Sequence, residues 1–530
     1  MKYLKYIFFS AVLLLSGCSS FLKEYSQDTD YVNSWKDLNE TLIGDCYMPE
    51  YVANNISPSL DNQYFIHFLG DELDESPDSY NNSDMQYDGK EKVFGLYTWQ
   101  ARSGQNDTYT GYNVENANWT QCYKLINVAN NILYSLKTVP QNTKDEKLGN
   151  IKVDGEARFL RAYYYFWLVN LYSKPYVASS ASTDLGVPIK ISEKVEDKKF
   201  QRNTVQEVYD LILSDLTIAE TDLEQYGSQP SVFRADVSAV RFLLSRVYLY
   251  MQNWSKAAEY AQKVIDAHPG LVSLNTLEKG SAFLSSSSVE TIFSMGGNSM
   301  PCFTTYEYKG FKISDDVYNL YSDNDLRKTR FIWHYGNFNG YTKVAVAGKN
   351  LPVSKEDPSY YFNAYSYPWE FNQIDVSDKF LFRSAEAYLT KAEAEAYLGN
   401  NEDEARSLIN KLRSFRYAPG TDYQVTATGE DLVKLIRDER ERELCLEGQR
   451  WFDLRRYGVC EKYPESKRIV HTYYYYVDRG SKVKTKCCKF VLQPNDWGYT
   501  LPIPQDVIDF NTGMPNNERG NRTYTVTECQ

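Results

Sequence analysis

The amino-acid sequence predicts a mostly α-helical fold in which tetratricopeptide-like helix pairs stack into an α–α superhelix. Long irregular loops and a small β-hairpin near the C-terminus complete the predicted fold. Apolar residues recur at helical spacing over several long segments. One helix pair, residues 236–269, carries small, Tyr, Ala and Pro residues at the spacing of a 34-residue repeat. The chain has 530 residues, and single cores usually split above about 250–300 residues, so a repeat-built body or two lobes is expected.

The N-terminus has the layout of a secretory signal peptide. Two lysines precede a short apolar run, residues 6–16, and small residues precede Cys18. The run is shorter than the roughly 20 apolar residues that a membrane-spanning helix needs. The ending Leu15-Ser16-Gly17-Cys18 resembles the lipobox of bacterial lipoproteins, in which the cysteine is lipidated. We therefore expect residues 1–17 to be removed and Cys18 to carry the only membrane attachment.

Charge and cysteine spacing exclude several classes of protein. The net charge is −12, and the absence of a long basic run argues against nucleic acid and anionic lipid surfaces as partners. The nine cysteines lack zinc-type spacing, and the adjacent Cys487 and Cys488 cannot easily pair with each other. We expect mostly reduced thiols, although export permits disulfides.

The helices are predicted in order from the periodicity of apolar residues. Residues 19–116 contain many turn residues, which favours short helices and long loops. Trp119 begins an amphipathic stripe that ends at Leu136, and we expect this tryptophan to lie in the core. Residues 154–172 are apolar almost all round, which is typical of an interior helix. Thr204-x-x-Glu207 is a capping box that opens a third helix.

The second half of the chain alternates between helix pairs and loops. Two helical hairpins are predicted, one over 236–251 and 255–267 and the other over 379–398 and 401–415, and residues 430–457 form a further long helix. Residues 273–376, between the hairpins, are rich in turn residues, and ordered loops of this length are usually functional. A β-hairpin is predicted from residues 471–477 and 482–492.

Four segments in order resemble the SusD/RagB family of outer-membrane glycan-binding lipoproteins: Gly155–Val177, Phe380–Asn400, Arg437–Gly458 and Leu501–Ile508. The resemblance divides the chain into a SusD-like N-terminal region, residues 18–290, and a SusD/RagB C-terminal region, residues 291–530. It implies four helix pairs with loops covering one side. It also implies that the protein lies on the outer face of the outer membrane and hands oligosaccharides to a SusC-like TonB-dependent β-barrel transporter.

The residues themselves do not suggest an enzyme. The sequence lacks the Gly-x-Ser-x-Gly, phosphate-loop and dinucleotide-binding motifs, and its four histidines lack metal-ligand spacing, so no metal and no cofactor are expected. The acidic run Asp71–Glu75 is expected to be a solvated loop. The alternating charges of Arg437–Gly458 are expected to be solvated or structurally paired rather than catalytic.

A glycan site needs flat aromatic faces beside polar groups that meet the ring hydroxyls. Two loop regions offer this combination, residues 97–119 and 299–372. Trp99 is the leading candidate, because it lies in a polar loop outside any helical stripe. The remaining aromatic candidates are Tyr97, Tyr109, Tyr112, Tyr306, Tyr308, Trp333 and Trp369, and the polar candidates are Arg102, Asn106 and Asp107.

Two other functions remain open at this stage. The ligand could be a peptide or glycopeptide, because part of the family resembles peptide-import systems. The chain could also be a repeat-built envelope scaffold without a nutrient ligand, since helix pairs support that function equally well.

Overall fold

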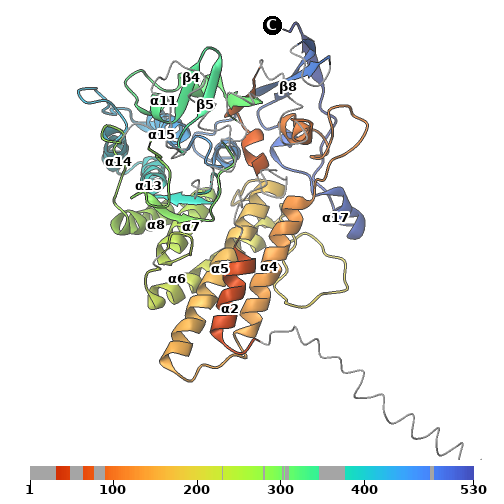
Figure 1. The fold of residues 1–530 in the computed structure, drawn as a ribbon, viewed down its shortest axis with the longest axis vertical. Helices are drawn as coiled ribbons and strands as arrows, with labels where there is room; N and C mark the ends of the chain where they lie inside the picture. The colour runs from red at the N-terminus through yellow and green to blue at the C-terminus, as the bar shows by residue number, and fades with distance from the viewer. Residues whose placement is uncertain are drawn as a thin grey trace, which may run out of the picture.

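The computed structural model describes residues 32–47, 64–76, 90–229, 231–277, 281–300, 304, 310–344, 376–477 and 483–529. Helices dominate this part of the chain, and the strands form small sheets (Figure 1). The predicted mostly α-helical fold with tetratricopeptide-like helix pairs is confirmed. The predicted division between residues 290 and 291 stays a prediction.

The described α-helices follow one another along the chain. They are α2 (Trp35–Thr41), α3 (Phe94–Tyr97), α4 (Ala117–Ser135), α5 (Lys144–Tyr172), α6 (Val205–Tyr226), α7 (Val237–Tyr250), α8 (Trp254–Ala267), α10 (Asp315–Asn319), α11 (Arg327–Arg330), α13 (Ser384–Leu398), α14 (Glu402–Ser414), α15 (Gly429–Leu444), α16 (Arg450–Gly458) and α17 (Gln505–Phe510).

The described strands form antiparallel pairs and one three-stranded sheet. β1 (Leu73–Glu75) pairs with β3 (Phe311–Ile313), β2 (Thr291–Ser294) with β6 (Leu381–Arg383), and β4 (Ile332–Tyr335) with β5 (Phe338–Tyr341). β7 (Ile469–Tyr476), β8 (Lys484–Leu492) and β9 (Tyr524–Thr527) form the larger sheet in that order. β7 and β8 are the predicted hairpin, whereas the short strand β9 was not predicted.

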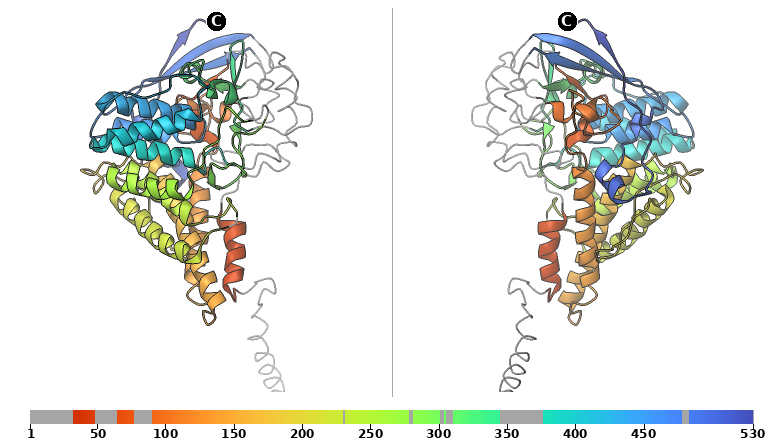
Figure 2. Two further views of the ribbon diagram at one scale, coloured as in Figure 1. Left: turned by 90° about the vertical axis from the view of Figure 1, so that its left-hand side faces the viewer. Right: turned by 90° about the vertical axis from the view of Figure 1, so that its right-hand side faces the viewer.

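Long helices form the body of the molecule. α5 packs along α4 on one side and α6 on the other, α7 pairs with α8, and both pack against α13. α13 pairs in turn with α14 and contacts α15. Figures 1 and 2 show these helices stacked side by side, with the α4–α5 turn at one end of the molecule and the β7–β8–β9 sheet at the other. Stacking of this kind buries the apolar face of each helix against its neighbour.

Local sequence signals explain where several helices begin. Trp119 is buried in α4, as its apolar stripe predicts. The Thr204 hydroxyl accepts the N–H of Glu207, and the Glu207 carboxylate accepts the N–H of Thr204, so the predicted capping box opens α6. α13 begins at Ser384 rather than at residue 379, because residues 381–383 pair with β2 as strand β6.

The predicted long helix over residues 430–457 is wrong, because the chain breaks between α15 and α16. Leu446 and Gly448 have φ angles of 55° and 72°, which lie in the left-handed region. A Cβ on Gly448 would stand 2.6 Å from the Cβ of Lys379, so a glycine is needed at this corner. The break separates α16 from α15 and places Gly448 against Lys379, which lies two residues before β6.

Carboxylates of α15 anchor a buried ion-pair network. Glu443 accepts hydrogen bonds from Arg327, Arg383 and Arg416, which come from α11, β6 and the turn after α14. Glu443 and all three arginines have almost no exposed surface. Burial alone raises the pKa of Glu443, but the arginines hold it well below its usual range. Most charged side chains of Arg437–Gly458 are likewise buried inside the protein, whereas Asp438 is exposed.

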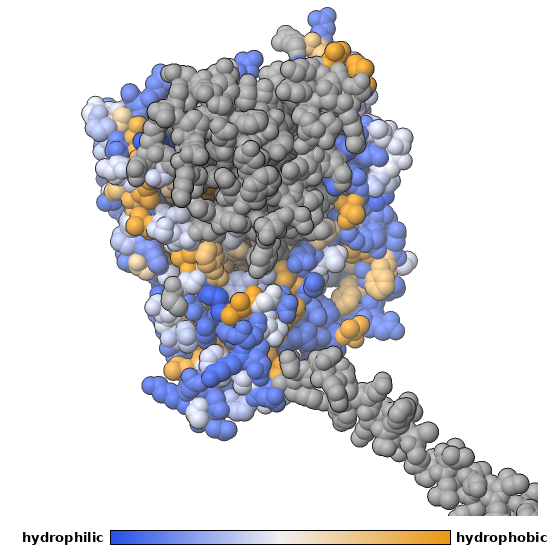
Figure 3. Space-filling model, in the orientation of Figure 1, coloured by the Kyte–Doolittle hydropathy of each residue, from blue (hydrophilic) through white to orange (hydrophobic). Residues whose placement is uncertain are grey.

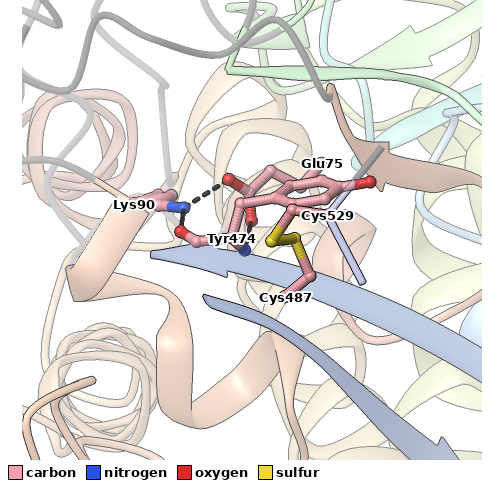
Figure 4. Close-up of a disulfide and its surroundings, with 5 residues drawn as sticks. All are labelled: Glu75, Lys90, Tyr474, Cys487 and Cys529. Atoms are coloured by element: carbon pink, nitrogen blue, oxygen red, sulfur yellow. Dashed lines mark hydrogen bonds and ion pairs between the residues drawn. A yellow bond between two sulfur atoms is a disulfide. The ribbon is translucent and has the colours of Figure 1, made fainter. Parts of the chain in front are cut away.

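The acidic run Asp71–Glu75 is also buried in part, which corrects the expectation of a solvated loop. Asp71 accepts two hydrogen bonds of 2.7 Å from Arg450 of α16. Glu75 pairs with Lys90 and accepts the N–H of Tyr474 at 3.0 Å, which ties β1 to β7 (Figure 4). Burial removes these carboxylates from water, and specific partners replace the lost hydration.

One disulfide closes the C-terminal sheet. Cys487 of β8 is bonded to Cys529, which follows β9, with 5.4 Å between their Cα atoms (Figure 4). This bond corrects the expectation of reduced thiols for this pair. Free and buried thiols are found, among the described residues, at Cys46, Cys122, Cys445, Cys460 and Cys488.

We expect Glu443→Gln to destabilise the fold by about 3–5 kcal/mol, because it leaves three buried arginines short of a counter-charge. The matched control is Glu430→Gln on the same helix, since Glu430 pairs with Lys434 at 2.8 Å with half of each side chain exposed. That change should cost less than about 1 kcal/mol. Urea unfolding measures both, and equal losses would contradict the role given to Glu443.

Glu72 should make stability depend on pH. Burial raises its pKa to about 8, although the N–H of Leu446 lowers it. In the unfolded chain the pKa of a glutamate is about 4.5. Between about pH 4.5 and pH 8, therefore, only the folded state keeps this proton. The free energy of unfolding falls as pH rises through this range. Glu72→Gln removes this ionisation and keeps an oxygen for the N–H of Leu446.

The melting temperature of Glu72→Gln relative to wild type should therefore rise between about pH 5 and about pH 8. Glu40→Gln, at an exposed position of α2, corrects for the general loss of one carboxylate. If the melting temperatures of Glu72→Gln and wild type differ by the same amount at both pH values, Glu72 does not hold a proton in the folded protein.

Candidate functional site

A pocket of about 440 Å³ lies at the α7–α8 turn, and another of about 410 Å³ lies where β3, α10 and the β4–β5 hairpin meet. The second combines stacked rings with charged and amide side chains, and we call it the hairpin pocket. Its lining residues are Lys312, Asp315, Tyr318, Asn319, His334, Gly336 and Asn337. It lies within the second loop region that the sequence analysis selected.

Local sequence features shape the hairpin pocket. The Ser314 hydroxyl accepts the N–H of Val317 and starts α10, which places Asp315 at the pocket. Tyr335 and Phe338 pair across the hairpin, so Gly336 and Asn337 form a two-residue turn. Gly336 has φ of 58°, the left-handed conformation that such tight turns require.

Two rings form the aromatic part of the pocket. Tyr318 and His334 are stacked, with 4.6 Å between ring centroids and 14° between ring planes. Tyr318 is half-buried on α10, whereas His334 is exposed on β4. The exposed His334 ring gives this stack an accessible aromatic face, which suits the apolar C–H face of a sugar ring.

Charged and amide groups surround the rings. Lys312 donates to both carboxylate oxygens of Asp315 at 2.8 Å and to the carbonyl oxygen of Asn337 at 3.0 Å. Lys312 is buried, but the Asp315 side chain is 65% exposed and can accept further hydrogen bonds. The pocket therefore offers an aromatic face next to hydrogen-bonding groups, which is the arrangement that a carbohydrate needs.

The predicted residues of the second loop region do not line this pocket. Trp333 is only 5% exposed, and its ring packs 6.1 Å from that of Phe338, so its expected role as an exposed stacking platform is wrong. Adjacent residues of a strand face opposite sides, and His334 takes the exposed side instead. Tyr306, Tyr308 and Trp369 lie outside the described residues.

Sequence reasoning missed Tyr318 and His334. His334 follows Trp333 directly, so strand alternation could have indicated it once Trp333 was assigned to the core. Tyr318 lies three residues after Asp315 in a helix too short to show periodicity. Its pairing with His334 depends on a tertiary contact.

The first loop region contains two core residues. Trp99 and Tyr97 are fully buried and stack on His471 of β7, with centroid distances of 4.3 Å and 4.1 Å. The indole N–H of Trp99 donates to the carbonyl oxygen of Leu69 at 2.9 Å. Both predictions of a glycan-stacking role are corrected, because neither ring face is accessible.

Other candidates of the first loop region reach the surface. Tyr109 and Tyr112 are 45% and 55% exposed. The guanidinium of Arg102 lies 3.7 Å from the ring centroid of Tyr112 and pairs with Glu115. Because Glu115 fixes the guanidinium, the contact holds the tyrosine ring in place.

Asn106 and Asp107 hold the same loop in shape. The Asn106 side-chain oxygen accepts the N–H of Thr110 at 3.1 Å, and Asp107 accepts the hydroxyl of Tyr473 at 2.7 Å. The second contact ties the loop to β7. A ligand-binding role for Tyr109, Tyr112, Arg102, Asn106 and Asp107 stays a prediction.

Two kinds of feature are absent from the described residues. In them, no helix is both long and apolar enough to cross a bilayer, and no group of three or more His, Cys, Asp and Glu side chains could hold a metal ion. On the face shown in Figure 3, the described residues are mostly hydrophilic, with scattered apolar patches. Cys18 lies outside the described residues, so its lipidation stays a prediction.

Two family models match the chain. The model described as the SusD family matches residues 280–520, and the model described as starch-binding, associating with the outer membrane, matches residues 50–249. Among curated proteins, SusD-like protein P2 of Formosa agariphila is 24% identical over 64% of this chain and 70% of its own length. Starch-binding protein SusD of Bacteroides thetaiotaomicron is 25% identical over 57% of this chain and 64% of its own length.

Solved structures share the fold. A SusD superfamily protein of Bacteroides thetaiotaomicron superimposes with a TM-score of 0.64 at 22% identity, covering 92% of this chain and 100% of that chain. A SusD-like carbohydrate-binding protein of Bacteroides vulgatus gives a TM-score of 0.64 at 20% identity, covering 91% of this chain and 97% of that chain.

We expect Trp99→Ala to lower the free energy of unfolding by about 3–5 kcal/mol, as truncation of a core tryptophan does. Tyr112→Ala, in the same loop but exposed, should cost less than about 1 kcal/mol. Chemical denaturation of both variants measures the difference. A Trp99→Ala protein as stable as wild type would show that this ring does not belong to the core.

Proposed function

Because the chain belongs to the SusD family, we propose that it is a lipid-anchored outer-membrane protein that binds glycans and delivers them to a SusC-like TonB-dependent transporter. The protein acts by binding rather than by catalysis. Binding requires an accessible aromatic face with polar groups at its edge. The hairpin pocket offers both, and on this observation we assign the binding site to it.

The membrane attachment in this proposal rests on the sequence. Residues 1–17 have the layout of a signal peptide, and Cys18 follows them at the lipidation position. Burial of acyl chains contributes about 0.8 kcal/mol per CH₂, so more than one chain holds a protein at the bilayer. The matching family model is itself described as associating with the outer membrane, which supports this location. The partner transporter rests on the family resemblance.

We expect Tyr318→Ala to weaken glycan binding at least about tenfold, or 1.4 kcal/mol, because it removes half of the stacked ring pair. Tyr134→Ala is the matched control, since Tyr134 is 47% exposed on α4, in the helical body. Isothermal titration of a glycan panel and of a peptide panel measures binding. Thermal melting confirms that both variants are folded.

Three results would contradict parts of the proposal. Binding of peptides and no glycan would identify a peptide-import protein. Binding of neither class would favour an envelope scaffold. Glycan binding that Tyr318→Ala leaves unchanged would move the site away from the hairpin pocket.

A further inference from the structure

A buried amide holds the polar wall of the hairpin pocket in place. Asn339 of β5 has no exposed surface. Its side-chain NH₂ group donates to the carbonyl oxygen of Ile313 at 3.1 Å and to Oδ1 of Asp315 at 2.9 Å. Its side-chain oxygen lies 2.7 Å from Nδ1 of His334. One amide therefore contacts both the carboxylate and the imidazole of the pocket.

These contacts determine which nitrogen of His334 carries the proton. The two acceptors occupy the NH₂ side of Asn339, so its oxygen must face the imidazole. An amide oxygen only accepts hydrogen bonds, and Nδ1 of His334 must therefore be the donor. In the neutral ring the lone pair then lies on Nε2. Within the described part of the chain Nε2 has no hydrogen-bond partner, and His334 is exposed.

Acidic groups outnumber basic ones around the pocket. Asp315 and its exposed neighbour Asp316 lie at the start of α10, and Asp74 of β1 pairs in register with Lys312 of β3. Burial raises the pKa of Asp74 to about 6. The charge of Lys312 lowers this pKa, whereas the charges of Asp315 and Asp316 raise it. The charges of these four side chains therefore interact.

The basic groups near the rings are already paired. Lys312 bonds Asp315 and the backbone of Asn337 with its ammonium group. Lys328 lies 5.1 Å from the ring centroid of Tyr318 and pairs with Asp323 at 2.7 Å. Each ammonium already has a carboxylate partner, and a ligand carboxylate or sulfate would also meet the charges of Asp315 and Asp316.

We propose that the hairpin pocket selects a neutral sugar ring whose hydroxyls donate to Nε2 of His334 and to Asp315, and that it rejects uronate-containing and sulfated glycans. Asn339 is the positioning residue that orients both acceptors. This inference rests on the proposed glycan-binding function and names the substrate class of the same site.

Affinity electrophoresis against two sets of polysaccharides tests the selection. The neutral set is amylopectin, laminarin, xylan and galactomannan, and the anionic set is polygalacturonate, alginate and chondroitin sulfate. Wild-type protein should be retarded by at least one neutral polysaccharide and by none of the anionic ones. Asp315→Asn should weaken the neutral interaction about tenfold, as expected for loss of a charged acceptor. Asp403→Asn, on α14 at an exposed position, is the charge-matched control.

Nuclear magnetic resonance tests the tautomer independently of any ligand. Long-range proton–nitrogen correlation spectra distinguish a protonated Nδ1 from a protonated Nε2, and His334→Phe assigns the signals among the four histidines. In the neutral imidazole of wild type, Nδ1 should be protonated and Nε2 unprotonated. Asn339→Leu removes the acceptor and should shift the equilibrium toward protonated Nε2, provided that the melting curve shows a folded protein.

The outcomes separate this inference from the proposed function. If an anionic polysaccharide retards the protein as strongly as a neutral one, the proposed selection is wrong, although glycan binding itself stands. The same conclusion follows if Asp315→Asn does not change the binding of a neutral polysaccharide. A protonated Nε2 in wild type would overturn the assigned role of Asn339. Retardation by none of the polysaccharides would contradict the proposed function itself.

Discussion

The buried carboxylate of Glu443 is the constraint on which the rest of the structure depends. It binds Arg327, Arg383 and Arg416, and these arginines come from three separate segments of the chain. Breaking a buried pair of this kind costs several kcal/mol, so the elements must assemble around Glu443 together. α11 carries Arg327 and is followed directly by β4, which carries His334. The helical body therefore sets the position of the hairpin pocket through this network.

Much of the helical body could be predicted from the sequence, because its signals are local. The stripe that begins at Trp119 and the capping box at Thr204 involve residues a few positions apart, and both helices form where expected. The break between α15 and α16 could not be predicted in this way. It depends on the close approach of Gly448 to Lys379, which are distant in sequence. The disulfide between Cys487 and Cys529 is equally a long-range feature.

The site was only partly predictable for the same physical reason. The hairpin pocket lies within the second loop region that the sequence indicated, but the residues that line it depend on tertiary contacts. Trp99 looked exposed because its neighbours in sequence are polar, yet His471 of β7 covers its ring. Trp333 and His334 are adjacent, and only the packing of β4 decides which of them faces outward. A polar loop sequence therefore does not establish that its aromatic rings are accessible.

In the proposed function, the helical body presents the hairpin pocket as the place where a glycan binds. Hydrogen–deuterium exchange with and without a bound neutral oligosaccharide tests it most directly. Added protection should be concentrated in residues 311–341, which contain β3, α10 and the β4–β5 hairpin. Protection confined to the α7–α8 turn, where another pocket is lined by Gln252 and Trp254, would contradict it.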